Sequence, residues 1–439
     1  MKQFIKKLSQ SQKIPFDKIV LGLIYNRPIG FWIRHKEYLN LQFLKKLDKI
    51  LIISDVNIGD SIMLQTAVES FRYYFPNVEI DYMYNAKVDK LIGHNPSITT
   101  AYPLFHSSTD QNQNQENLEK IHDVLQHNNY DLILNVCPLV TRKDLKRNNG
   151  LVITAVNLLL RILNSHKRGK MASLPFHVVD YINQIIDHLP ARLRPTLKSF
   201  QYNGTFVYLD RDVVQQRSEF VGKHSLSPDS RFIFINPDTS NIYTFIQPEF
   251  YVKLIHSLLQ SGQVDGILLG RSYKFKGTST KIYNDISAHF KDRVTMLPRH
   301  ASLAFYAAMV DWCDGYVTGD TGPLHIAAAQ KVATQSDYSF SNNTVIVSLF
   351  KATEPTIYGY DSFSKSIIDS SQSAPARAYE LDLSCKDITC SVQRIIKTCD
   401  ATNCMSSFRA DEISDFILQN INHKERPKNY ELSPSVNWQ

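Results

Sequence analysis

The chain has 439 residues, of which 43% are hydrophobic and 21% charged, and its formal net charge at pH 7 is +7. This length suits two domains better than one core. No apolar run is long enough to span a bilayer, and residues 1–12 lack the apolar stretch and cleavage site of a signal peptide. We therefore expect a cytoplasmic protein whose six cysteines are thiols or metal ligands.

The basic charge is concentrated in residues 1–49. This segment holds eleven Lys and Arg residues against three acids, so the rest of the chain is close to neutral. Aromatic and aliphatic residues alternate with the basic ones, which suits an anionic membrane surface. An N-terminal helix packed on the first domain is the alternative. Because no nucleic-acid-binding motif is present, we expect residues 1–48 to form a basic amphipathic extension without a nucleic-acid partner.

Strands and helices alternate in the first half of the chain. A helix is predicted at 61–75, a polar surface loop at 110–116 and an apolar helix at 150–163. Three short apolar runs are predicted strands: 49–55, 78–84 and 130–136. This βαβ alternation predicts a parallel, Rossmann-like sheet, and we assign residues 49–228 to this domain.

The same alternation restarts near residue 229. Helices are predicted at 248–261 and 303–310. Four further apolar runs are predicted strands: 231–236, 265–270, 315–318 and 344–350. We expect a second Rossmann-like domain at 229–423 and a loose tail at 424–439. Ligands of such sheets bind at the carboxyl ends of the strands.

One motif follows a predicted strand in the second half: Gly319-Asp320-Thr321-Gly322-Pro323-Leu324-His325. Thr321 or Asp320 suits the N-cap of a helix, and Pro323 suits its first position. Gly322 lets the backbone approach a ligand. The exposed N–H groups and the positive end of the helix dipole predict an anion site, where His325 can donate to a phosphate oxygen. The alternative is an ordinary capped helix with a buried histidine.

A second motif, Asn57-Ile58-Gly59-Asp60, follows the first predicted strand. A carboxylate at this strand-to-helix turn can accept a proton from a hydroxyl group. The alternative role of Asp60 is that of a helix N-cap, which is the more common role for Asp in such turns. Gly59 and Asn57 are weaker candidates on the same turn.

Four cysteines lie close together near the C-terminus: Cys385, Cys390, Cys399 and Cys404. Four thiolates can hold Zn²⁺ or iron tetrahedrally, although the spacing is looser than in a zinc knuckle. Reduced thiols or two disulfides are the alternatives. Cys137 and Cys313 lie beside predicted strands, where we expect small core residues.

Taken in order, the Gly59-Asp60 turn, the 319–325 motif and the later Thr353-Glu354-Pro355 resemble glycosyltransferase family 9, the bacterial heptosyltransferases of lipopolysaccharide core assembly. The resemblance runs from about Lys49 to Ile421. It implies a GT-B architecture, in which two Rossmann-like domains face each other across a cleft. It also implies an inverting, metal-independent transfer of a sugar from a nucleotide diphosphate, such as ADP-heptose, to a lipid-linked glycan.

The resemblance implies a role for each matching residue. Asp60 would be the general base that activates the acceptor hydroxyl. The donor would be bound by the second motif and by two strand-end segments: Asp320, Thr321, Gly322, Pro323, His325, Thr239, Ser240 and Glu354. No catalytic cofactor is implied, and the cysteines offer a structural Zn or Fe site. The enzyme would work on the inner face of the cytoplasmic membrane. A nucleotide-sugar-binding protein with little catalysis and a transferase with a protein acceptor are the alternatives.

Three departures from the family pattern concern phosphate and ribose contacts. Ser54 stands in the first strand where family members carry Lys or Arg. The loop before Pro248-Glu249 lacks the family's Lys, and the acid usual after Gly270 is missing. Arg271 and Lys274 are candidates for the phosphate contacts.

Overall fold

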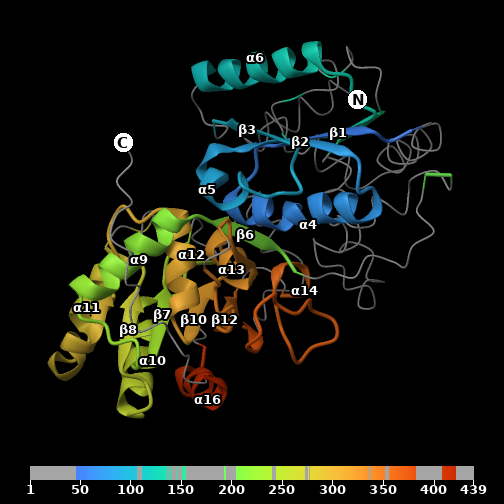
Figure 1. Ribbon diagram of the computed structural model, residues 1–439. Helices are drawn as coiled ribbons and strands as arrows, with labels where there is room; N and C mark the ends of the chain where they lie inside the picture. Colours follow the sequence, from blue (N-terminus) through green and yellow to red (C-terminus); the bar gives the residue numbers. More distant parts are fainter. Residues whose placement is uncertain are drawn as a thin grey trace, which may run out of the picture. The chain divides into compact units, whose positions relative to one another are not determined.

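The computed structural model describes residues 46–105, 111–135, 151–154, 204–239, 244–271, 277–335, 338–351, 355–381 and 408–421, together with a few isolated positions. The described residues fall into two compact units (Figure 1). Unit 1 holds those up to Thr205 together with Thr356–Tyr358, and unit 2 holds the others. Each unit is built on its own parallel sheet. The prediction of two Rossmann-like α/β units is therefore confirmed.

Unit 1 contains a five-stranded sheet in the order β3-β2-β1-β4-β5, in which every pair is parallel. Its strands are β1 (Lys49–Ser54), β2 (Glu79–Asn85), β3 (Thr100–Leu104), β4 (Leu132–Asn135) and β5 (Leu151–Thr154). Its helices are α4 (Ile58–Tyr74), the short α5 (Asp89–Ile92) and α6 (Gln111–His127). Figure 1 shows α4 and α6 on opposite faces of the sheet. Four of the six residues of β1 are apolar and fully buried because helices cover both faces.

Two predictions about unit 1 were wrong. The polar run at 110–116, predicted as a loop, contains the start of α6. The helix is anchored because Asn117 accepts from the Phe105 N–H at 2.8 Å and donates to the Phe105 carbonyl at 2.7 Å, while Ile121 and Val124 pack into the core. The predicted helix at 150–163 begins instead as strand β5, because residues 151–154 pair with β4. The remainder of that segment lies outside the described residues.

Unit 2 contains a six-stranded sheet in the order β13-β12-β10-β7-β8-β9, again parallel throughout. Its strands are β7 (Phe232–Asn236), β8 (Gly266–Leu269), β9 (Val294–Met296), β10 (Gly315–Gly319), β12 (Val345–Phe350) and β13 (Ala376–Glu380). The helices of unit 2 are α9 (Arg211–Lys223), α10 (Pro248–Gln260), α11 (Thr278–Asp285), α12 (Leu303–Trp312), α13 (Gly322–Ala328) and α16 (Ala410–Asn420). The short helix α14 (Pro355–Tyr358) is divided: Pro355 belongs to unit 2 and the other three residues to unit 1. The core cluster joins α10 and α16 to the inward side chains of β7 and β12.

The division between the units lies at Thr205–Phe206, earlier in the chain than the predicted boundary at 228–229. The reason is a two-stranded sheet that the sequence did not reveal. Strand β6 (Phe206–Leu209) pairs in parallel with β11 (Gln330–Ala333), which attaches residues 206–228 to unit 2.

One further expectation about the core is confirmed. Cys137 and Cys313 are buried free thiols, as predicted. Within the described ranges, none of the helices combines the length and the apolar character that crossing a bilayer requires.

The amino end of β7 offers a test of what holds the central strands together. The buried carboxylate of Asp314 accepts a hydrogen bond from the Phe232 N–H at 2.8 Å, and the exposed Asp265 accepts one from the Arg231 N–H at 2.7 Å. We expect Asp314→Ala to lower the free energy of unfolding by about 1–3 kcal/mol, because it leaves a buried N–H without its acceptor. Asp265→Ala should cost less than half as much, because water can replace its carboxylate. Chemical denaturation of both variants measures the difference. Equal losses of unfolding free energy in the two variants would contradict the greater importance of the buried Asp314 hydrogen bond.

Candidate active site

The strand order of unit 2 reverses between β7 and β10. From β7 the chain runs outward to β8 and β9, then returns to the other side of β7 as β10. The segments that follow the two strands therefore leave the sheet at the same carboxyl edge. In open α/β sheets this switch point is where ligands bind. The predicted donor residues lie in the segments that follow these two strands.

Buried polar side chains join the ends of β7 and β10. The Asn236 side-chain amide donates to Thr318 Oγ1 at 3.0 Å, and Thr318 Oγ1 lies 3.4 Å from Thr321 Oγ1. Asn236 is 2% exposed and Thr318 is fully buried. The two strand ends are thus linked by hydrogen bonds that hold the start of the 319–325 motif in place.

The motif forms the predicted strand–turn–helix. Strand β10 ends at Gly319 and α13 begins at Gly322, with Thr321 as the N-cap residue in an extended conformation. The Thr321 side chain does not cap the helix. Its hydroxyl lies near Thr318 instead. Pro323 is in the first turn, and residues 320–323 are half-buried. The backbone N–H groups at this helix start, not a side-chain cap, are what the turn offers to an anion.

His325 is enclosed by unit 2. Its side chain is 4% exposed, and its Nδ1 lies 2.9 Å from the hydroxyl of the fully buried Tyr360. The two rings meet edge to face with centroids 5.7 Å apart. The contact fixes the orientation of the imidazole ring. Tyr360 lies 35 residues further along the chain, so sequence reasoning did not identify it.

A loop that precedes α10 completes the carboxyl edge. Thr239, predicted to bind the donor, is buried, and its hydroxyl lies 2.5 Å from that of Thr244. A Cβ atom built on Gly319 would lie 3.7 Å from the Thr244 carbonyl oxygen and 3.7 Å from Ile246 Cδ1. The loop therefore packs over the end of β10, next to the motif.

A lysine that the sequence did not single out reaches the same loop. Lys351 follows the last residue of β12, is 7% exposed, and its Nζ donates to the Phe245 carbonyl at 3.2 Å. The available signal was a basic residue placed directly after a buried strand, at the edge where ligands bind. Arg271, which the sequence favoured, donates instead to the Leu297 carbonyl at 2.9 Å.

Unit 1 has a switch point of its own, between β1 and β4. Asn57, not Asp60, is the N-cap residue of α4, which starts three residues earlier than predicted. Asp60 lies half-buried in the first helical turn, and Gly59 is buried beside it. The N-cap alternative for Asp60 is therefore wrong. A carboxylate in the first turn of a long helix is stabilised in its charged form by the helix dipole.

Ser54 ends β1, directly before the buried Asp55. The side chain of Ser54 is fully buried, as is that of Tyr82 on the neighbouring strand. Burial raises the pKa of the Tyr82 phenol far above its ordinary value. Nearby, Asn85 donates to the Val56 carbonyl at 3.1 Å, which holds the turn before α4. The position that carries Lys or Arg in the resembled family is here an uncharged serine.

Several predicted residues lie outside the described ranges: Ser240, Glu354, Lys274, Cys385, Cys390, Cys399, Cys404 and residues 1–45. Among the residues that are described, no cluster of three or more His, Cys, Asp or Glu side chains is able to hold a metal ion. The metal site at the cysteines stays a prediction.

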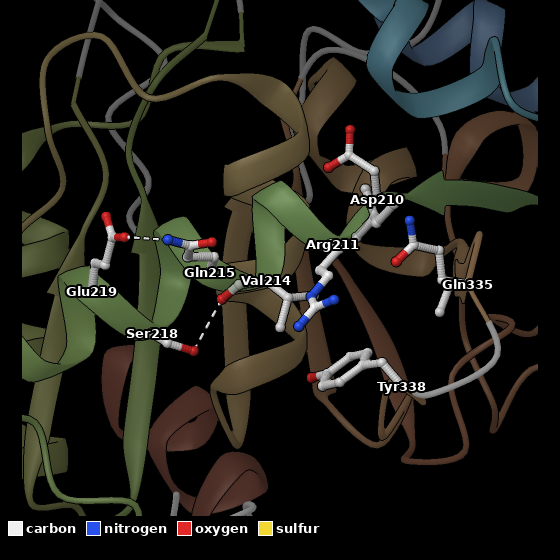
Figure 2. A pocket seen from close by; sticks show the side chains of 10 residues that line it. Asp210, Arg211, Val214, Gln215, Ser218, Glu219, Gln335 and Tyr338 are labelled. Atoms are coloured by element: carbon white, nitrogen blue, oxygen red, sulfur yellow. Dashed lines mark hydrogen bonds between the residues drawn. The ribbon is translucent and has the colours of Figure 1, made fainter. Parts of the chain in front are cut away.

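A surface cavity lies elsewhere in unit 2, between the start of α9 and the residues after β11 (Figure 2). Its polar wall groups are bonded to one another: Gln215 donates to Glu219 at 2.9 Å, and Ser218 to the Val214 carbonyl at 3.0 Å. None of the ten residues that line it is a predicted site residue.

Comparisons with known proteins point to one family. Residues 200–373 match the family model of glycosyltransferase family 9 (heptosyltransferase). Lipopolysaccharide heptosyltransferase 3 of Escherichia coli (strain K12) is 21% identical over 302 residues, which cover 67% of this chain and 80% of that protein. The stretch matched by the family model, residues 200–373, contains β7, β10 and the 319–325 motif.

Solved structures agree in fold. The glycosyltransferase family 9 protein of Veillonella parvula DSM 2008 superposes with a TM-score of 0.58 at 16% identity, covering 85% of this chain and 98% of its own. For the E. coli heptosyltransferase WaaC with ADP, the TM-score is 0.51 at 16% identity, and the superposition covers 85% of this chain and 99% of that chain. Sequence match and fold lead to the same conclusion. The family-model match over residues 200–373 and the relative support a heptosyltransferase-like, family 9 assignment, and the fold is the two-unit α/β fold of GT-B enzymes.

Proposed function

We propose that this protein transfers heptose from ADP-heptose onto a lipid-linked glycan such as the lipopolysaccharide core, with inversion at the sugar carbon. The observation that carries the proposal is the polar carboxyl edge at the β7–β10 switch point, which lies inside the family-matched stretch. The relatives' names, a lipopolysaccharide heptosyltransferase and a heptosyltransferase with ADP, support this donor and acceptor.

The donor diphosphate occupies the start of α13 in this proposal. As the glycosidic bond breaks, negative charge grows on the leaving diphosphate. The backbone N–H groups that begin at Gly322 stabilise that charge more in the transition state than in the ground state. Asp320, Thr321 and Pro323 shape the turn, and Thr239 contributes a hydroxyl from the end of β7. Ser240 and Glu354 keep their donor roles as predictions.

His325 donates a hydrogen bond to the diphosphate in this scheme. The Tyr360 hydroxyl, 2.9 Å from Nδ1, orients the ring, so the role falls to Nε2. Tyr360 is thereby a positioning residue.

Asp60 serves as the general base on the acceptor side. It takes the proton of the acceptor hydroxyl as that oxygen attacks the sugar carbon. Its place in the first turn of α4 favours the ionised carboxylate, which is the form that a base requires. Gly59 and Asn57 form the turn that presents it. Residues 1–48 hold the enzyme at an anionic membrane surface, on the inner face of the cytoplasmic membrane, close to a lipid-anchored acceptor.

Replacing Asp60 tests the catalytic assignment. We expect Asp60→Asn to lower kcat by about 100-fold to 10,000-fold, because the amide cannot accept the proton, with little change in donor KM. The matched control is Asp212→Asn, which alters an exposed first-turn acid of α9 and should retain turnover. Steady-state kinetics with ADP-heptose and an acceptor glycan give both constants. Turnover of folded Asp60→Asn close to that of the parent protein would refute the role.

The His325–Tyr360 pair gives a second test. His325→Ala should lower kcat by about 100-fold or more, because the donor to the leaving group is lost. Tyr360→Phe should lower kcat by about tenfold with an unchanged donor KM, since the ring loses only its orienting bond. Tyr306→Phe is the control, because it also removes a buried hydroxyl, bonded to Tyr316 at 2.6 Å. Circular dichroism checks that each variant folds. Equal effects of the two tyrosine variants on kcat would count against the positioning role.

The alternatives differ in turnover and acceptor. A nucleotide-sugar-binding protein with little catalysis would be stabilised by ADP-heptose in a thermal-shift assay without forming product. A transferase with a protein acceptor would release ADP only when a polypeptide is supplied. We expect product formation with a lipid-linked glycan, measured as glycan mass increase. Binding without product on any acceptor would favour the first alternative.

A further inference from the structure

Lys351 extends beyond the edge of the unit 2 sheet. Strand pairing sets Gly319 of β10 opposite Leu349 of β12, so Lys351 stands two residues past the end of β10. At about 3.3 Å per residue, this is roughly 7 Å further along, at the level of the turn into α13. The lysine is therefore at the height of Asp320 and Thr321, on the neighbouring strand.

The ammonium is directed toward that turn. Lys351 Nζ donates to the Phe245 carbonyl, 106 residues earlier in the chain. The flanking residues Thr244 and Ile246 both approach Gly319, as the 3.7 Å distances from its Cβ position show. Phe245 thus belongs to the loop that packs over the end of β10. Its carbonyl holds the positive charge beside the predicted phosphate site.

A second buried lysine in unit 2 shows what a structural role looks like. Lys331 Nζ donates to the carbonyls of Ala327 at 2.6 Å and Ala329 at 2.9 Å, at the C-terminal end of α13. A cation there complements the helix terminus and its dipole. Lys351 lies near the opposite end of the same helix, where the dipole is positive and disfavours a cation. A cation at that end adds to the positive potential that draws a phosphate to a helix start.

The basic side chains near the carboxyl edge of the unit 2 sheet also favour Lys351 as the phosphate contact. Within unit 2, Arg271 is directed to the Leu297 carbonyl, and the loop at 244–247 carries no basic side chain. Lys351 supplies a positive charge to this loop from the end of β12. Lysine binds phosphate as a point charge, through short charge-assisted hydrogen bonds.

We infer that Lys351 binds the diphosphate of the nucleotide donor in this protein, at the turn between β10 and α13. The inference rests on the proposed function, in which that turn holds a nucleoside diphosphate. When the donor binds, the ammonium contacts a phosphate oxygen while Phe245 keeps the side chain extended across the edge. Part of the diphosphate charge is thereby balanced by a side chain from β12.

The test compares nucleotides that differ only in phosphate. Isothermal titration of the full chain with adenosine, AMP and ADP gives the gain in affinity from adenosine to ADP. We expect Lys351→Met to reduce this gain by about 10-fold to 100-fold, the usual effect of losing one hydrogen bond to a charged group. Lys351→Gln should show a similar loss, although its amide still donates to the Phe245 carbonyl. Lys351→Arg should retain most of the gain.

Lys331→Met is the matched control, because it also removes a buried lysine. It should lower the unfolding temperature and leave the ADP-to-adenosine ratio unchanged. The ratio of ADP affinity to adenosine affinity is measured within each variant, so a general loss of binding does not alter it. If Lys351→Met does not fold, Lys351→Gln and Lys351→Arg test the inference. An ADP gain within about twofold of the parent value in Lys351→Gln overturns the inference while the proposed function stands. A parent protein that binds none of ADP, GDP, UDP and CDP overturns both.

Discussion

The parallel pairing of β7 and β10 is the constraint on which the rest of unit 2 depends. Both strands end at the same edge, and the strand order reverses between them, which is the place where open α/β sheets bind ligands. The hydrogen bond from Asn236 to Thr318 links the two ends. The loop before α10 packs against the end of β10 and against the lysine after β12 at this edge, beside the 319–325 motif.

Unit 1 repeats the arrangement with a different chemistry. Its strand order reverses between β1 and β4, and the turn after β1 leads directly into α4. Near this edge the side chains of Ser54, Tyr82 and Asn85 are buried and uncharged. Asp60 is the acid in the first turn of α4, where the helix dipole supports its charge.

Much of the secondary structure was predictable because the strands of parallel sheets are buried on both faces and appear as apolar runs. The strands β1, β2, β4, β7, β8, β10 and β12 were found in this way. The strands β6 and β11 were missed because their pairing partner lies more than a hundred positions away in the chain. The first residues of α6 were also missed, because Asn117 anchors them through contacts with the backbone of Phe105 rather than through a local pattern.

The sequence by itself determined the chemistry of the site: a Gly-Asp turn, an Asp-Thr-Gly-Pro-Leu-His motif and the order in which they follow buried strands. It also indicated the family, since these residue types are local and need no knowledge of packing. Only the tertiary structure decided which groups meet them. Tyr360 reaches His325 across 35 residues, and Lys351 reaches Phe245 across 106. Such contacts are set by strand order and register, which no local spacing of residues encodes.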